Sequence, residues 1–189
     1  MLLAFHKPYG CLSQFTKDGS PHQPLVDFNF PPQVYAIGRL DADSEGLLLL
    51  SDEPGLNTLL LDPKNTHKRY YWAQVEGVPT IQALKKIEEG ITIQDYQTLP
   101  ARSWILDPQP VLAPRIPPIR MRKTIPDSWI ALELIEGKNR QVRRMTAAVG
   151  YPTLRLIRVR IGNFELSDLA VGTWRELNEK ERAQVMDET

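Results

Sequence analysis

The chain has 189 residues, of which 42% are hydrophobic and 24% are charged, and this globular composition excludes a wholly disordered protein. Its apolar runs, such as Leu47–Leu50, are far shorter than the roughly 20 residues that cross a bilayer, so no membrane partner is expected. The N-terminus lacks the basic front and long apolar stretch of a signal peptide. The single cysteine, Cys11, excludes an internal disulfide, and we expect a protein of the reducing cytoplasmic compartment.

The charges are balanced in number but segregated along the chain. Lys and Arg total 23, as do Asp and Glu, and a formal net charge of zero by itself argues against a nucleic-acid partner. Residues 137–164, however, contain seven basic residues and no acidic one, whereas from residue 165 onward seven acids face three bases. We therefore expect one strongly positive face. The alternative interpretation is an ordinary solvated surface with ion pairs. The lack of acids in the basic segment argues against this alternative.

Runs of apolar and β-branched residues predict the strands. In chain order these cover residues 2–5, 34–37, 47–51, 70–75, 91–93, 101–106, 129–135 and 154–161. The run over 47–51 is unbroken, which fits a strand buried on both faces. Two segments without such runs are expected to be loops, the polar residues 16–32 and the proline- and arginine-rich residues 107–126.

Four helices are expected between or after these strands, over residues 56–61, 79–89, 139–149 and 178–186. The second begins at Pro79 and ends at Gly90, as helices often do. The third places Val142 and Met145 on one face, so Arg140 and Arg143 face elsewhere. Many strands with few helices indicate an α+β fold, a mixed and mainly antiparallel sheet with flanking helices, in a single domain over residues 1–189.

Polar side chains are concentrated directly before the apolar run at 47–50. Asp41, Asp43 and Ser44 lie between Arg39 and Glu45. A polar loop on a rigid apolar element is a common way to hold a catalytic group. Asp41 can act as a nucleophile only when it is ionised, and a neighbouring arginine would favour that form. The alternative is an acidic turn that merely satisfies backbone donors, which is the commoner situation for a single loop aspartate.

The segment Gly38-Arg39-Leu40-Asp41, followed by Ser44, Gly46 and the leucine run, resembles the central motif of pseudouridine synthases, particularly the branch that modifies bacterial ribosomal RNA. Further segments resemble the other motifs of this family in the same order. These are Lys7-Pro8-Tyr9-Gly10, Lys68-Arg69-Tyr70, residues 136–145 and the strand at 154–162. One short match would be weak evidence, but ordered motifs over most of the chain are specific.

The resemblance implies a catalytic site formed by three residues. Asp41 would be the nucleophile or base, Tyr70 would pack against the target base, and Arg143 would pair with Asp41. Contacts to RNA or to the base are expected from a further set: Lys7, Arg39, Lys68, Arg140, Leu156 and Arg158. The alternatives are a mainly structural role for Lys7 and an ordinary core role for Leu156. The resemblance also implies two lobes around a central cleft.

This branch often has a small N-terminal RNA-binding domain of the S4 type. We expect none here because the first motif begins at residue 2. RNA binding would then depend on the basic face of the catalytic domain. Ser44 stands where threonine is common, and both residues supply a hydroxyl.

The expected function is therefore isomerisation of a uridine to pseudouridine in ribosomal RNA, with the 23S RNA of the large subunit as substrate. We expect a monomer that needs no cofactor and, with three histidines and one cysteine, has no metal site. Whether Asp41 attacks the ribose C1′ or removes a sugar proton to give a glycal stays open.

Two other functions fit parts of the pattern. A non-catalytic RNA-binding protein could use the basic surface between Arg115 and Arg160. A glycoside or nucleoside hydrolase could pair Asp41 with Asp43 or Asp52, although an arginine beside the nucleophile does not suit the acid with a raised pKa that such enzymes need.

Overall fold

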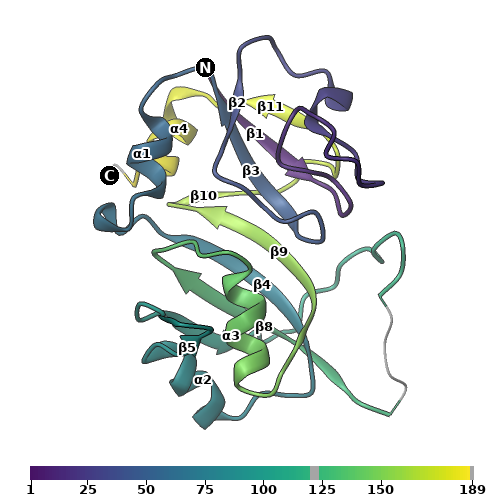
Figure 1. Cartoon of the computed structure of the whole chain (residues 1–189), viewed down its shortest axis with the longest axis vertical. Helices are drawn as coiled ribbons and strands as arrows, with labels where there is room; N and C mark the ends of the chain where they lie inside the picture. The colour runs from purple at the N-terminus through teal and green to yellow at the C-terminus, as the bar shows by residue number, and fades with distance from the viewer. Residues whose placement is uncertain (120–123, 188–189) are drawn as a thin grey trace. The chain divides into compact units, whose positions relative to one another are not determined.

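The computed structural model describes residues 1–119 and 124–187, and it confirms an α+β fold with a mixed sheet and few helices (Figure 1). The chain forms two compact units. Unit 1 contains Met1–Arg69 and the chain from Ile157 onward, and unit 2 contains Tyr70–Leu156. The two boundaries fall inside strands β4 (Arg69–Glu76) and β9 (Thr153–Ile161).

Unit 1 is built on strands in the order β11-β1-β3-β9, with β2 paired to β3 and β10 paired to β9. Its strands are β1 (Leu2–Lys7), β2 (Tyr35–Ile37), β3 (Glu45–Ser51), β10 (Phe164–Glu165) and β11 (Trp174–Glu176). Its helices are α1 (Leu56–Leu61), α4 (Glu179–Val185) and the 3-10 turns η1 (Leu25–Phe28) and η2 (Pro63–Asn65). The β3–β9 pair is parallel and the neighbouring pairs are antiparallel, so the sheet is mixed as expected.

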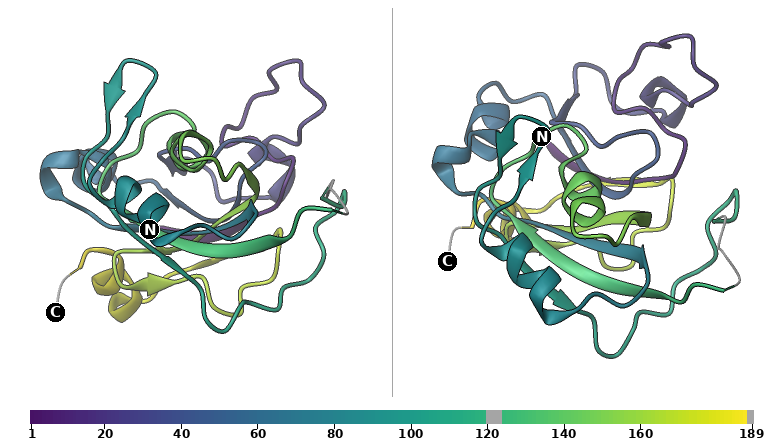
Figure 2. Two further views of the ribbon diagram at one scale, coloured as in Figure 1. Left: turned by 90° about the horizontal axis from the view of Figure 1, so that it is seen from below. Right: turned by 60° about the horizontal axis from the view of Figure 1, so that its bottom comes forward.

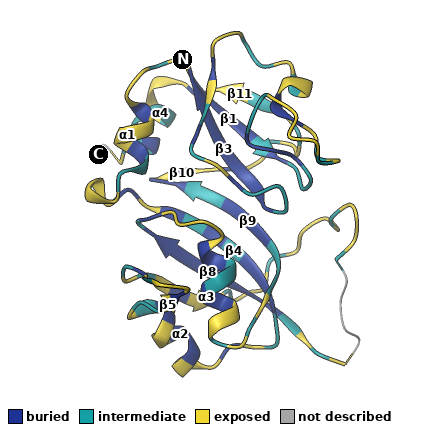
Figure 3. Cartoon of the chain, viewed as in Figure 1, coloured by how far each residue is buried: buried dark blue, intermediate teal, exposed yellow. Residues whose placement is uncertain are grey.

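Strand β3 is covered on both faces, which explains its unbroken leucine run (Figure 3). Leu47 and Leu49 belong to a core that also contains Leu60 of α1 and Val185 of α4. Successive side chains of a strand point to opposite faces, so Leu48 and Leu50 face the other side. There Leu48 is paired with Phe5, whose ring packs edge-on against Phe28 and Phe30 with centroids 4.8 and 5.1 Å away. Each fully buried leucine contributes about 1.5–3 kcal/mol, so β3 is a stable base for the loop before it.

Unit 2 contains strands in the order β9-β4-β8-β7 and a separate hairpin of β5 and β6 (Figure 2). Its remaining elements are α2 (Ile81–Glu88), β5 (Thr92–Ile93), β6 (Tyr96–Gln97), β7 (Arg102–Ile105), β8 (Asp127–Leu134) and α3 (Gln141–Ala148). Helix α2 begins after Thr80, whose hydroxyl accepts a hydrogen bond from the Ala83 amide at 3.2 Å, and not at Pro79 as expected. Ser103 of β7 binds this helix by donating its hydroxyl to Leu84 O at 3.2 Å.

Helix α3 has the predicted apolar face, with Val142, Met145 and Thr146 buried. It begins two residues later than expected because Arg140 adopts a left-handed conformation, with φ 52°, and serves as the N-cap. The expected loop at 107–126 contains no helix or strand over its described residues, and residues 120–123 lie outside them. Within the described part of the chain, no helix is both long and apolar enough to cross a membrane.

Candidate active site

Asp41 lies at the start of a tight turn that leads directly into β3. The Ser44 amide donates to Asp41 O at 3.0 Å and closes this turn. Leu40 before it and Ser44 after it are buried, whereas Asp41 itself is half-buried. The carboxylate is therefore on a fixed backbone and still reaches the surface of unit 1.

Three residues of the N-terminal segment fix this turn. The Ser13 hydroxyl accepts from the Leu40 amide at 2.9 Å and donates to Leu40 O at 2.7 Å. The Gly10 amide donates to Ala42 O at 2.7 Å, and the Lys7 ammonium donates to Ser44 O at 2.7 Å. The backbone is thus held on both sides of Asp41, which is the support that a precisely oriented catalytic group needs. Ser13 was missed by sequence reasoning, since no motif marks it.

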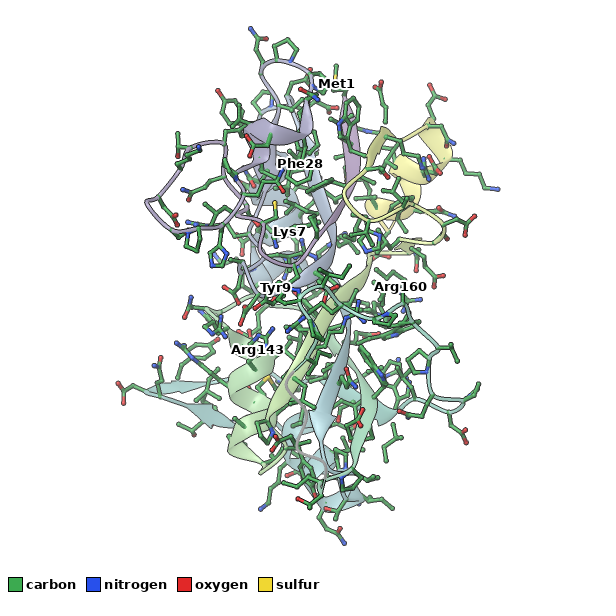
Figure 4. All side chains as sticks on the ribbon, turned by 90° about the vertical axis from the view of Figure 1, so that its right-hand side faces the viewer. Met1, Lys7, Tyr9, Phe28, Arg143 and Arg160 are labelled. Atoms are coloured by element: carbon green, nitrogen blue, oxygen red, sulfur yellow. The ribbon has the colours of Figure 1, made fainter. Side chains whose placement is uncertain are left out.

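Lys7 is fully buried in unit 1, with 0% of its surface exposed (Figure 4). Its ammonium also donates to Pro8 O at 3.1 Å. Burial lowers the pKa of Lys7 to about 8, and the neighbouring Cys11, Asp43, Glu45 and Asp41 partly offset that fall. A side chain that is enclosed in this way favours the structural alternative for Lys7 over an RNA contact. Lys7 instead stabilises the turn that contains Asp41.

For Arg158 the structure does not favour the expected RNA contact, because its side chain is 3% exposed and its Nε donates to Leu47 O at 2.7 Å. It is paired with Gly46 in the parallel β3–β9 register. Gly46 has φ 104°, and a Cβ there would lie 2.3 Å from Arg158 O. The Gly46 of the central motif is therefore required by the close approach of β9, and Arg158 supports β3 from inside the unit instead of contacting RNA.

Three of the residues expected to contact RNA are exposed, namely Arg39 and Lys68 in unit 1 and Arg140 in unit 2. Arg39 donates from Nη2 to Gln14 Oε1 at 3.1 Å. Their exposure makes them available to a polyanion.

Unit 2 contains the other expected site residues, Tyr70, Arg143 and Leu156. Tyr70 is half-buried in β4, next to the boundary with unit 1. Arg143 is half-buried on α3, and its Nη1 donates to Thr153 O at 3.3 Å at the start of β9. This contact anchors Arg143 to the start of β9. Leu156 is buried.

A buried carboxylate, that of Glu136, organises the residues around the start of α3, and sequence reasoning gave it no role. Only 1% of Glu136 is exposed. Its oxygens accept from Tyr96 Oη at 2.5 Å, from the Leu99 amide at 2.8 Å and from Gln141 Nε2 at 2.7 Å. The hydrogen bond to Glu136 raises the pKa of Tyr96. Among residues 1–119 and 124–187, no group of His, Cys, Asp and Glu side chains is placed to bind a metal ion.

Comparison with known proteins gives consistent matches over most of the chain. A family model described as RNA pseudouridylate synthase matches residues 1–148. The ribosomal large subunit pseudouridine synthase E of Xanthomonas axonopodis pv. citri is 53% identical over 171 residues, which are 90% of each protein. The protein of the same name from Vibrio parahaemolyticus is 47% identical over 176 residues, 93% of this chain and 73% of the relative. A crystal structure of a pseudouridylate synthase superposes with a TM-score of 0.80 at 25% identity, covering 97% of this chain and 73% of the other.

Proposed function

The chain belongs to the RNA pseudouridylate synthase family, and we propose that it converts a uridine of large-subunit ribosomal RNA into pseudouridine. The observation that supports this substrate most strongly is the 53% identity, over nine-tenths of both proteins, to an enzyme named for the large ribosomal subunit. The single buried cysteine suits a cytoplasmic enzyme. A monomer suffices for the proposed site, because one chain supplies all of the motif residues.

The reaction needs no co-reactant, because pseudouridine is an isomer of uridine. The bond between uracil N1 and ribose C1′ breaks, the base turns, and a bond forms between C5 and C1′. The hydrogen on C5 leaves as a proton and N1 gains a proton, so atoms and electrons balance. The enzyme has to supply a group that acts on the sugar, a surface that holds the detached base, and contacts that keep the RNA in place.

Asp41 is the proposed group that acts on the sugar. Its half-exposed position on a turn fixed by Ser13, Gly10 and Lys7 supports this role. The carboxylate either attacks C1′ to form a covalent adduct or removes a sugar proton to give a glycal. Each route requires the ionised form of Asp41.

Tyr70 is the proposed packing partner of the uracil, Arg143 the proposed partner of the Asp41 carboxylate, and Leu156 a proposed residue of the base pocket. The motif match and the half-buried positions of Tyr70 and Arg143 support the first two roles. The target base must leave its stack, which costs a few kcal/mol and less in a loop or single strand. Contacts of exposed Arg39, Lys68 and Arg140 with phosphates would offset that cost.

The test compares Asp41→Asn with Asp43→Asn, since both remove one carboxylate from the same turn. Ribosomal RNA containing 5-tritiated uridine releases tritium when C5 loses its hydrogen. We expect Asp41→Asn to abolish release while RNA binding stays within about threefold of wild type. We expect Asp43→Asn to keep substantial turnover. Sustained release by Asp41→Asn would refute the assigned role.

The same assay separates the alternative functions. RNA binding by the wild-type protein without any tritium release would indicate a non-catalytic RNA-binding protein. Free uracil as the product would indicate a hydrolase. Isomerisation instead leaves the base attached to the RNA.

A further inference from the structure

The hairpin of β5 and β6 presents an aromatic ring that the proposed catalytic site does not use. Tyr96 is half-buried on β6, and Lys138 Nζ lies 4.3 Å from the centre of its ring. We propose that this face of Tyr96 is a stacking site for an unpaired base of the RNA substrate, outside the target uridine. This inference rests on the proposed function, since it assumes an RNA substrate.

The orientation of the ring is set by its hydroxyl. Tyr96 Oη donates to Glu136 at 2.5 Å, and that carboxylate is itself fixed by the Leu99 amide and by Gln141 Nε2. Gln141 is the first residue of α3, so the ring is tied to the start of the arginine-bearing helix. A ring that is already held in place loses little conformational entropy when a ligand stacks on it.

The face of the ring is accessible because the group that covers it is a flexible, exposed side chain. Lys138 is exposed, and its ammonium makes a cation–π contact with Tyr96. An incoming base can take this face while the Lys138 ammonium moves to a backbone phosphate. Proteins that bind single-stranded RNA combine these two contacts, an aromatic platform and a nearby cation.

The charges around Tyr96 favour RNA over a protein segment as the ligand. Lys138 and Arg140 are exposed in the turn before α3, and Arg144 is half-buried in its first turns. Arg144 also holds this turn by donating from Nη2 to Asn139 Oδ1 at 2.8 Å. The acids beside Tyr96 are the exposed Asp95, its neighbour in the chain, and the buried Glu136, so the three bases outnumber them and attract a polyanion.

The experiment uses a fragment of large-subunit ribosomal RNA that the wild-type protein binds, with 2-aminopurine placed in turn at each of its unpaired positions. Stacking on an aromatic ring quenches the fluorescence of 2-aminopurine. We expect the wild type to quench at one position and Tyr96→Phe to quench there equally. We expect Tyr96→Leu to lose this quenching and to raise KM about tenfold, with kcat within about twofold of wild type.

Two further variants complete the test. Tyr35→Leu is the matched control, because Tyr35 is 68% exposed on β2 and is not part of the proposed platform. It should leave both quenching and KM unchanged. Lys138→Met should keep the quenching. The plot of log K for RNA binding against the log of the salt concentration should have a slope shallower by about 0.7, the change expected when one phosphate contact to a single strand is lost.

Each unfavourable outcome has a distinct meaning. Equal loss of quenching in Tyr96→Phe and Tyr96→Leu would overturn the proposal, since the hydroxyl contact to Glu136 would then explain the effect. Wild-type quenching and a wild-type KM in Tyr96→Leu would also overturn the proposal. A wild type that quenches 2-aminopurine but releases no tritium would support the stacking site and refute the proposed function instead.

Discussion

Lys7 and Cys11 are two ionisable side chains inside unit 1, and both are fully buried. Burial lowers the pKa of Lys7 from 10.5 to about 8 and raises the pKa of Cys11 from 9.0 to about 11, with each group partly offsetting the shift of the other. Both shifts disfavour the charged form, but their effects on the pH dependence of stability have opposite signs.

Between pH 8 and 10.5 the unfolded chain binds more protons at Lys7 than the folded chain does, so Lys7 makes the free energy of unfolding rise with pH. Between pH 9 and 11 the folded chain retains the Cys11 proton that the unfolded chain loses, so Cys11 makes the free energy of unfolding fall. We expect the wild type to gain stability from pH 8 to 9, at up to about 1.4 kcal/mol per pH unit, and to level off above pH 9.

Chemical denaturation at pH 8, 9 and 10 checks this expectation. In Cys11→Ala the rise should continue to pH 10, whereas in Lys7→Met stability should be flat from pH 8 to 9 and fall above that. If Lys7→Met does not fold, Cys11→Ala still decides the question. Parallel curves for Cys11→Ala and wild type above pH 9 would contradict the predicted cancellation.

The sequence predicted which residues are chemically important better than it predicted what they contact. The motif match identified Lys7 and Arg158, and the resemblance led us to expect RNA contacts from both, because a motif marks a position without giving its contacts. A signal for Arg158 was present, since it shares a strand face with the apolar Leu154 and Leu156. For Lys7 the signal was absent, because the strand was expected to end at Phe5 and the alternation that turns Lys7 inward was not visible. The role of Ser13 was not predictable, because its hydrogen bonds join it to Leu40, 27 positions further along the chain, and no local pattern encodes such a contact.

At the level of elements, the parallel contact between β3 and β9 depends on Gly46. A Cβ there would lie 2.3 Å from Arg158 O and 2.7 Å from Arg158 N, and both are backbone atoms that cannot turn aside. The φ of 104° is also unfavourable for any residue with a side chain. We expect Gly46→Ala to lower the free energy of unfolding by more than about 3 kcal/mol and to abolish tritium release.

The matched control is Gly55→Ala, in the turn before α1. Gly55 has a similar φ of 90°, but a Cβ there would meet nothing within 4 Å. Its substitution therefore imposes the backbone strain without the steric clash, at a cost of about 1–2 kcal/mol. Urea denaturation of both variants gives the comparison. Equal losses of stability in the two variants would show that backbone strain alone explains the effect of Gly46→Ala and that the close approach of β9 does not contribute.

The longer elements were predictable because burial is encoded locally in them. The leucine run of β3, the amphipathic α3 and the capped α4 each contain their own signal. Strands β6, β10 and β11 were missed because they are only two or three residues long, too short to show an alternating pattern. Strand β11 is in addition defined by pairing with the distant β1. The start of α3 was misplaced because a left-handed arginine at the N-cap is rare.

At the level of the whole molecule, a net charge of zero conceals a division of the chain into basic and acidic stretches. Burial and ion pairing change how much of each stretch is exposed. Arg158 is buried, whereas Lys138 and Arg140 are exposed. Toward the C-terminus, Glu181 is paired with Arg175 at 2.6 Å, and Arg182 is paired with Glu53 of the turn after β3 at 2.5 Å. Glu181 of the acidic stretch is thus paired within the stretch, and the exposed bases before α3 are the ones we expect to bind RNA.

The prediction at this scale is that RNA affinity depends on where a charge lies and not on the total. The double variants Arg140→Gln with Arg144→Gln, on α3, and Lys85→Gln with Lys86→Gln, on the exposed side of α2, each remove two positive charges. If net charge governed binding, both would weaken it equally. If local phosphate contacts govern binding, only the α3 variant should reduce the slope of log K for RNA binding against the log of the salt concentration. The expected reduction is about 1.4, for two contacts to a single strand. Titrations of fluorescently labelled RNA at several salt concentrations measure these slopes, and equal slopes for the two variants would contradict a localised RNA-binding face.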